Sequence, residues 1–220
     1  NGSVFRYATH ENSILGAIHA QLEASDVKDK KELMEFIDSI THYKVGSGKS
    51  EVTIAGKRDM IDLLEVVKRY FYHPSMKGSN SIKVVLPAVL KSSQAIVDKY
   101  SQPIYGSVIP SLNIPAEDPK SWITRSADGE IENPYKHLDE ISAFLGVSTE
   151  EAEEFDTSSQ MDDPMKGTIN NGGIALAAYT KLQFSDERCT GALAEALLRY
   201  CELDTMSMVF IWEYFMEATR

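Results

Sequence analysis

An aspartate stands in the middle of the most apolar stretch of the chain, which runs from Leu197 to Trp212 (LLRYCELDTMSMVFIW). The stretch belongs to a run from Gly191 that is rich in Ala, Leu, Met and Glu and contains no proline, so it predicts a long helix. Steps of three and four residues bring Asp204 and Tyr200 onto the apolar face of that helix. The whole predicted face consists of Leu193, Leu197, Tyr200, Asp204, Met208, Ile211 and Phe215.

A carboxylate on a buried face needs a partner, because an unpaired charge away from water is costly. We therefore expect Asp204 to meet a backbone donor, a basic side chain or a metal cation. A competing interpretation ends the helix near Cys201 and makes Asp204 the N-cap of a second helix, a position that aspartate favours.

Two further acids could take part in the same chemistry. Glu11 falls in the first turn of a predicted helix, directly after a short apolar strand, and Asp62 lies in the segment MIDLLEVV. Mg²⁺ and Mn²⁺ take oxygen ligands, and the charge of the cation offsets the burial of a carboxylate. For Asp62 an ion pair is the stronger expectation, with Arg58 one turn earlier or with Lys57 or Arg69.

Other chemistries are poorly supported by the sequence. Gly48-Lys49-Ser50 resembles the end of a phosphate-binding loop, but Tyr43 stands where that motif needs a glycine, which favours a flexible loop. The five histidines form no metal-binding pair of the usual spacing, and no nucleophile elbow is present. The Ser/Asn cluster from Gly78 to Ser81 is expected to cap a helix.

The composition limits the class of protein. With 220 residues, 43% of them hydrophobic, the chain suits one globular domain with or without an appendage. A formal net charge of -11 argues against electrostatic wrapping of a nucleic-acid duplex, although an enzyme that works through bound cations remains compatible with it. Cys189 and Cys201 are expected to be reduced thiols, and the absence of a long apolar run or leader motif predicts a cytoplasmic protein without a membrane span.

The predicted elements are mainly helices. Thr9 is expected to cap a first helix with Ile14, Leu15, Ile18 and Leu22 on its apolar face; later helices are predicted over 30–40, 59–73 and 78–100, with Pro87 kinking or dividing the last of these. The segment 42–58 is predicted to be a loop with a short strand at most. Residues 101–171 form a predicted insertion or lid with a short helix over 138–145. Another helix is predicted to start at Gly172-Gly173, and Ser185 to cap the final one.

Many helices and few strands predict either a nearly all-α protein or the helix-dominated part of an α/β domain whose sheet lies mostly upstream. The abrupt start of the chain favours the second, an α/β fold. We divide it into a first part of the main domain (1–100), the insertion (101–171) and the C-terminal helices of the main domain (172–220).

Three stretches, in order, resemble a known family: VFRYATHENSIL, RDMIDLLEV with GSNSIKVVLPAVL, and ALLRYCELDTMSMV. They are similar to the DEDD 3′–5′ exonucleases of the ribonuclease H-like fold, and more closely to a bacterial family of uncharacterised proteins whose shared domain has been predicted to belong to that superfamily. The resemblance covers nearly the whole chain, except that 101–171 matches only the closer family.

The resemblance implies roles for particular residues. Tyr200 and Asp204 match the Y-x-x-x-D motif, in which the tyrosine places the attacking water and the aspartate binds a metal. Glu11 matches the acid of an N-x-x-[FY]-[DE] motif, in which His10 replaces the aromatic residue and the asparagine is not matched. Lys83 and Asn80 correspond to the helix beside the substrate groove. The implied cofactor is Mg²⁺ or Mn²⁺, and the implied substrate is the 3′ end of single-stranded DNA or RNA.

The first motif of that family, D-x-E on the first strand, does not occur before Glu11. We therefore expect the chain to be part of a longer protein whose upstream segment completes the site, and we expect this part alone to bind metal weakly and to be nearly inactive. In the complete protein, two cations roughly 3.5–4 Å apart would straddle the scissile phosphate. The alternative is an inactive nuclease-like fold that serves as a binding or assembly module.

Overall fold

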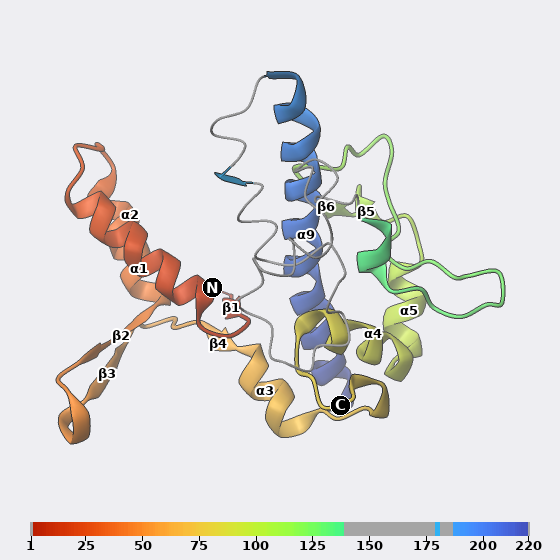
Figure 1. Ribbon diagram of the computed structural model, residues 1–220, viewed down its shortest axis with the longest axis horizontal. Coiled ribbons are helices and arrows are strands. Elements are labelled where there is room, and N and C mark those ends of the chain that lie inside the picture. The colour runs from red at the N-terminus through yellow and green to blue at the C-terminus, as the bar shows by residue number, and fades with distance from the viewer. Residues whose placement is uncertain (1, 139–178, 181–186, 220) are drawn as a thin grey trace. The chain divides into compact units, whose positions relative to one another are not determined.

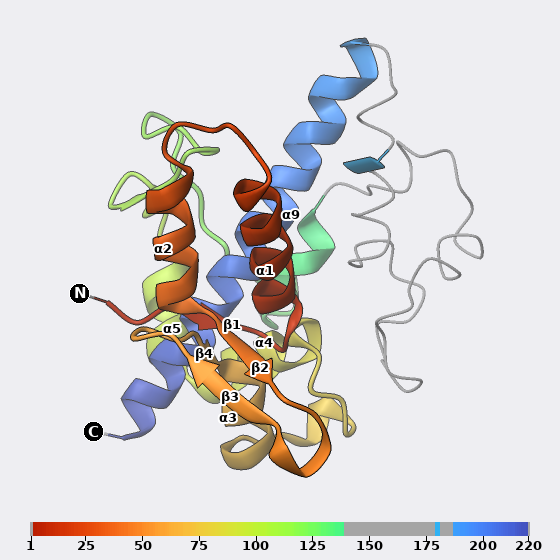
Figure 2. The same cartoon turned by 90° about the vertical axis from the view of Figure 1, so that its left-hand side faces the viewer.

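The computed structural model describes residues 2–138, 179–180 and 187–219, and it divides into two compact units, residues 1–72 and residues 73–220. Both units are drawn in Figure 1 and, after a quarter turn, in Figure 2. The architecture is mixed α/β, with helices and small two-stranded sheets, as the sequence predicted at that coarse level. The domain boundaries predicted near residues 100 and 171 stay predictions.

The first unit combines two small sheets with three helices. Its elements are β1 (Phe5–Arg6), α1 (His10–Glu23), α2 (Lys30–Ile40), β2 (His42–Val45), the 3₁₀ turn η1 (Gly48–Ser50), β3 (Val52–Ala55), β4 (Ile61–Asp62) and α3 (Leu63–Tyr70). Strands β1 and β4 pair in parallel, with Phe5 opposite Ile61. Figure 2 shows α1 and α2 side by side, and the β2–β3 hairpin projecting beyond them.

The hairpin replaces the predicted loop over 42–58. Strands β2 and β3 are antiparallel, with Tyr43 opposite Ile54 and Val45 opposite Val52, so four apolar side chains alternate onto one face. Gly46 has a φ of 91°, and a Cβ there would lie 2.6 Å from the Ser50 carbonyl oxygen, so the turn requires glycine.

The core of the first unit is small. Its buried apolar side chains are Ile37, Ile40, Met60, Leu63, Val67 and Phe71. The predicted apolar face of α1 is not buried within the unit: Ile14 is 47% and Ile18 is 38% exposed. Thr9 occupies the N-cap position of α1 as predicted, but its side chain does not make the expected capping hydrogen bond. The Thr9 carbonyl instead accepts the Ser13 hydroxyl at 3.0 Å.

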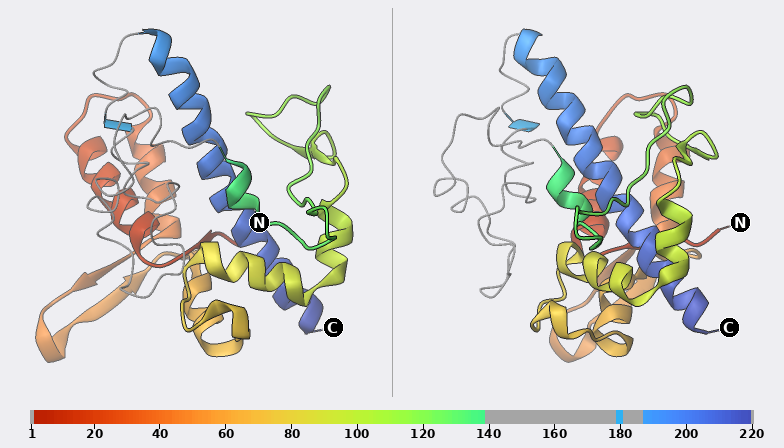
Figure 3. Two further views of the ribbon diagram at one scale, coloured as in Figure 1. Left: turned by 45° about the vertical axis from the view of Figure 1, so that its right-hand side comes forward. Right: turned by 90° about the vertical axis from the view of Figure 1, so that its right-hand side faces the viewer.

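The second unit is built along one long helix. Its elements are η2 (Pro74–Met76), α4 (Ile82–Ser92), α5 (Gln94–Tyr100), β5 (Tyr105–Gly106), β6 (Ile109–Pro110), the 3₁₀ helix η3 (Pro134–His137) and α9 (Glu187–Ala218). Helices α4 and α5 and the short η3 pack against α9, as both views of Figure 3 show. Leu86, Leu90, Leu203, Phe210 and Ile211 are at most 1% exposed and form the centre of this core.

Pro87 does not divide the helix in which it stands. It lies inside α4, and the break falls instead at Ser93, whose hydroxyl accepts the backbone N–H of Ile96 at 3.2 Å and so caps α5. The predicted helix over 138–145 and the one starting at Gly172 fall almost wholly outside the described residues, as does Ser185.

Helix α9 runs without interruption through Cys201 and Asp204, so the interpretation of Asp204 as an N-cap is wrong. The buried stripe of α9 passes through Leu193, Tyr200, Leu203, Ser207 and Phe210. Asp204 is half-buried at the margin of this stripe, whereas the sequence predicted it within the buried face. In the part of the chain that the structure describes, no helix combines the length and hydropathy needed to cross a bilayer.

Candidate functional site

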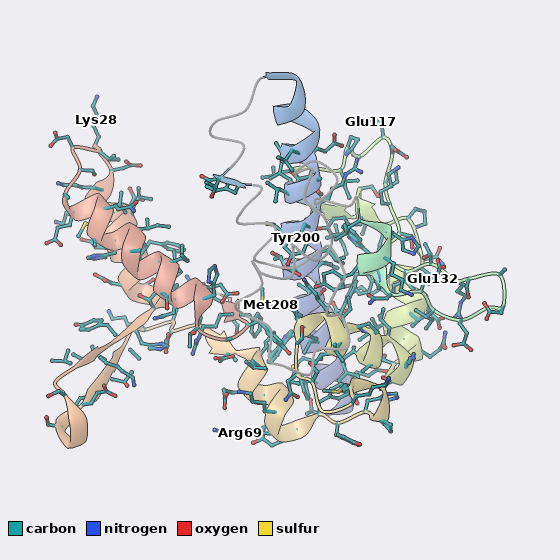
Figure 4. The ribbon with its side chains drawn as sticks, viewed as in Figure 1. Lys28, Arg69, Glu117, Glu132, Tyr200 and Met208 are labelled. Carbon is teal, nitrogen blue, oxygen red and sulfur yellow. The ribbon has the colours of Figure 1, made fainter. Side chains whose placement is uncertain are left out.

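Tyr200 and Asp204 lie one turn apart on α9, and Figure 4 labels Tyr200 together with Met208 on this helix. The Tyr200 side chain is buried at 5% exposure, and Asp204 is half-buried beside it. The two residues therefore share a side of the helix, as the i, i+4 spacing predicted. A tyrosine and a carboxylate so placed can act on one ligand.

Asp204 has a partner that the sequence did not predict. The Tyr135 hydroxyl donates to Asp204 Oδ1 at 2.6 Å and lies 3.1 Å from Ser207 Oγ, one turn further along α9. The Ser207 hydroxyl donates to the Leu203 carbonyl at 2.7 Å. A short hydrogen bond to an ionised acceptor is of the strong, charge-assisted kind, and it offsets part of the cost of burying the carboxylate.

Tyr135 reaches this position from η3, where Asn133 and Pro134 start a 3₁₀ turn. The Asn133 side chain accepts the backbone N–H of Tyr135 at 3.2 Å, and proline at the first position needs no N–H partner. Burial and the nearby Asp204 carboxylate raise the pKa of Tyr135 well above its ordinary value. The phenol is therefore a proton donor throughout the neutral pH range.

Lys83 joins the same group of side chains from the first turn of α4. Its ammonium lies 5.2 Å from the centre of the Tyr200 ring and 5.9 Å from that of the Tyr135 ring. Both distances fall within the range of cation–π attraction, worth about 0.5–2 kcal/mol each. The structure thus brings together Lys83, Tyr135, Tyr200, Asp204 and Ser207, which we call the α9 cluster.

Asn80 precedes α4 by two residues and is half-buried. The N-cap of α4 is Ser81, whose side chain makes no capping hydrogen bond, while the Ser79 hydroxyl accepts the Ser81 N–H at 3.2 Å. The Ser79 bond lies before the helix and satisfies none of the N–H groups of its first turn, so it is not the helix cap that was predicted. A substrate-binding role for Asn80 stays a prediction.

The first unit holds a second group of charged side chains, around the β1–β4 pair. Asp62 accepts the backbone N–H of Ala8 at 3.1 Å and of Leu64 at 3.0 Å, the second bond capping α3. Arg6 lies 3.2 Å from the other Asp62 oxygen and also donates to the Ala8 carbonyl at 2.6 Å. Asp62 thus pairs with Arg6 and not with the predicted Arg58, Lys57 or Arg69; Arg58 instead donates to the Gly2 carbonyl at 2.9 Å.

Glu11 lies in the first turn of α1, which follows β1. Its Oε1 accepts the Tyr7 backbone N–H at 3.4 Å, whereas Oε2 is buried and finds no hydrogen-bond partner among the described residues. A buried carboxylate oxygen without a donor is costly, and it is the kind of atom that a hard cation can satisfy. Burial and Asp62 raise the pKa of the neighbouring Tyr7 hydroxyl.

The two predicted metal ligands, Glu11 and Asp204, belong to different units, so their pairing stays a prediction. Considered separately, both fit a divalent cation: each is a carboxylate at least half removed from water, and Glu11 retains an unsatisfied oxygen. Across residues 2–138, 179–180 and 187–219, no three His, Cys, Asp or Glu side chains come close enough to form a metal site by themselves.

The sequence did not predict three members of these groups, Tyr135, Ser207 and Arg6. The Asn133-Pro134 pair signals a turn start, but nothing local connects Tyr135 to a carboxylate 69 positions away.

Comparison of the chain with family models, with curated proteins and with solved structures returned no match.

Proposed function

We propose that the chain is part of a metal-dependent 3′–5′ exonuclease of the ribonuclease H-like class that acts on single-stranded DNA or RNA. The observation that carries the proposal is the pair Tyr200 and Asp204, one turn apart on one side of an unbroken helix, with the Lys83 ammonium beside the tyrosine ring. Strand β1 adds support from the first unit, because it pairs in parallel with β4 and is followed in the chain by the acid Glu11.

Each residue of the proposal has a stated task. Asp204 and Glu11 would hold Mg²⁺ or Mn²⁺, together with acids from an upstream segment of the same protein. Such cations activate water and stabilise the leaving oxygen of a phosphodiester. The Tyr200 hydroxyl would orient the attacking water, and Lys83 would offer its positive charge to the substrate phosphate, with Asn80 nearby on the same approach.

The test uses the protein with its upstream segment, a single-stranded oligonucleotide labelled at its 5′ end, and Mg²⁺ or Mn²⁺. The expected result is stepwise shortening from the 3′ end, abolished by Asp204→Asn and by chelation, with the fold unchanged. Glu195→Gln is the matched control, because Glu195 is an exposed acid on α9 that pairs with Arg199. For the 220-residue chain alone we expect little activity and weak manganese binding. Absence of cleavage with several metals and substrates would contradict the proposal.

A second candidate function is a binding or assembly module without catalysis. The hydrogen bond from Tyr135 to Asp204 favours it, because it gives the half-buried carboxylate a structural partner that needs no metal. Under this alternative, Asp204→Asn changes the free energy of unfolding and there is no metal-dependent activity to lose.

A further inference from the structure

Tyr135 is held in the α9 cluster through both its backbone and its hydroxyl. Its side chain is 2% exposed, its backbone is fixed by Asn133, and its hydroxyl contacts both Asp204 and Ser207. The phenol has one proton, and the shorter contact, to the charged oxygen, takes it. The single Ser207 proton then serves the Leu203 carbonyl and the Tyr135 oxygen.

This geometry leaves a cation two ways to reach Asp204. It can displace Tyr135 from Oδ1, or it can bind the carboxylate while Tyr135 keeps its hydrogen bond to Oδ1. Displacement would move a buried ring out of its packing and strand a hydroxyl, which costs far more than the rotation of a side chain at a surface. The second route keeps every contact of Tyr135 in place.

We infer that Tyr135 is a positioning residue for Asp204: its hydrogen bond to Oδ1 fixes the orientation in which the carboxylate meets the divalent cation. The inference rests on the proposed function, because it assumes that Asp204 is a ligand. Partners that hold a ligand in place typically contribute a 10–100-fold effect on metal affinity or activity.

The test compares Tyr135→Phe with Tyr105→Phe in the protein with its upstream segment. Tyr105 is a matched control, since it is 7% exposed and donates at 2.9 Å to Glu202 of the same helix, a carboxylate outside the α9 cluster. Manganese affinity is measured by calorimetry, unfolding by urea, and kcat and KM on the labelled oligonucleotide. Tyr135→Phe should weaken manganese binding and lower kcat by about 10–100-fold with KM little changed. Tyr105→Phe should affect only unfolding.

The sign of the change in metal affinity decides the matter. Tighter manganese binding in Tyr135→Phe would show that Tyr135 competes with the cation, and unchanged binding would show that it does not act on Asp204. Either result would overturn the inference and leave the proposed function standing. If the unsubstituted protein neither binds manganese nor cleaves, the inference and the proposed function both fall. Should Tyr135→Phe not fold, Ser207→Ala removes the second contact of the phenol, and a smaller loss of affinity in the same direction is expected; no loss would overturn the inference.

Discussion

Replacement of Asp62 by alanine should unfold the first unit locally, because a single carboxylate there has three partners. It caps α3 through Leu64, it accepts the Ala8 N–H, and it neutralises Arg6. Arg6 and Asp62 expose 11% and 14% of their side chains, so the ion pair is largely shielded from water.

The size of the effect follows from these contacts. Loss of an N-cap costs about 1 kcal/mol. Removing one partner of a buried pair costs about 3–5 kcal/mol, because the remaining charge is left uncompensated. The two costs overlap, since they involve the same group, and we expect about 3–5 kcal/mol for Asp62→Ala. A unit of this size has a free energy of unfolding of roughly 4–10 kcal/mol, so the loss is a large fraction of its stability.

Asp62→Asn is the matched control. The amide keeps an acceptor for the N–H groups of Ala8 and Leu64 but removes the charge, so it should be more stable than Asp62→Ala by about 1–2 kcal/mol. Hydrogen exchange followed by mass spectrometry should show faster exchange over 5–13 and 61–71. Both tryptophans, Trp122 and Trp212, lie in the second unit, so their fluorescence reports its unfolding separately.

Equal losses in the two variants would show that the capping bonds contribute nothing. A loss below about 1 kcal/mol for Asp62→Ala would show that Arg6 and Asp62 behave as a solvated surface pair, and the reasoning from burial would then be refuted.

Three further predictions concern single features. Glu202→Ala should cost about 1–3 kcal/mol and speed limited proteolysis near residue 111, because the carboxylate accepts the Tyr105 and Ser111 hydroxyls; unchanged cleavage would argue against this. Burial and Asp204 raise the pKa of Tyr135, so the folded state binds the phenol proton more tightly than the unfolded state does. The contribution of Tyr135 to the free energy of unfolding should therefore be fully present below about pH 10 and should fall above it by up to about 1.4 kcal/mol per pH unit. Urea titrations should find this pH dependence reduced in Tyr135→Phe. Ala8→Gly should raise the unfolding free energy by about 0.5–1 kcal/mol in the same assay, because Ala8 has a φ of 72° that glycine adopts without strain.

Helix positions were the most predictable part of the fold, since their apolar period is a local property. The segment 30–40 was predicted with the bounds that α2 has, and of the two interpretations of the final helix the continuous one is confirmed. The hairpin was missed because Gly and Ser dominate its turn, although Tyr43 and Val45 alternate with polar residues on one side of it. Pro87 was given too much weight as a helix breaker, while Ser93, a side-chain cap, ends the helix.

The candidate site was predictable only in the residues that share one helix. Tyr200 and Asp204 follow from their spacing on α9, and Lys83 from the resemblance of its stretch. The hydrogen bond of Tyr135 and the ion pair of Arg6 depend on tertiary packing, which joins segments with no common local pattern. Such contacts leave no periodic signal in a single sequence.

Helix α9 carries acids that hold several separate segments at fixed heights. Glu202 and Asp204 receive hydroxyls from Tyr105 and Tyr135, and Glu213 and Glu217 receive those of Tyr100 and Ser93. Because each residue turns an α-helix by about 100°, insertion or deletion of one residue near Met206 would rotate the last two acids away from their donors while leaving the first two in place. The segment of this helix between Asp204 and Glu213 should therefore tolerate substitutions far better than insertions or deletions.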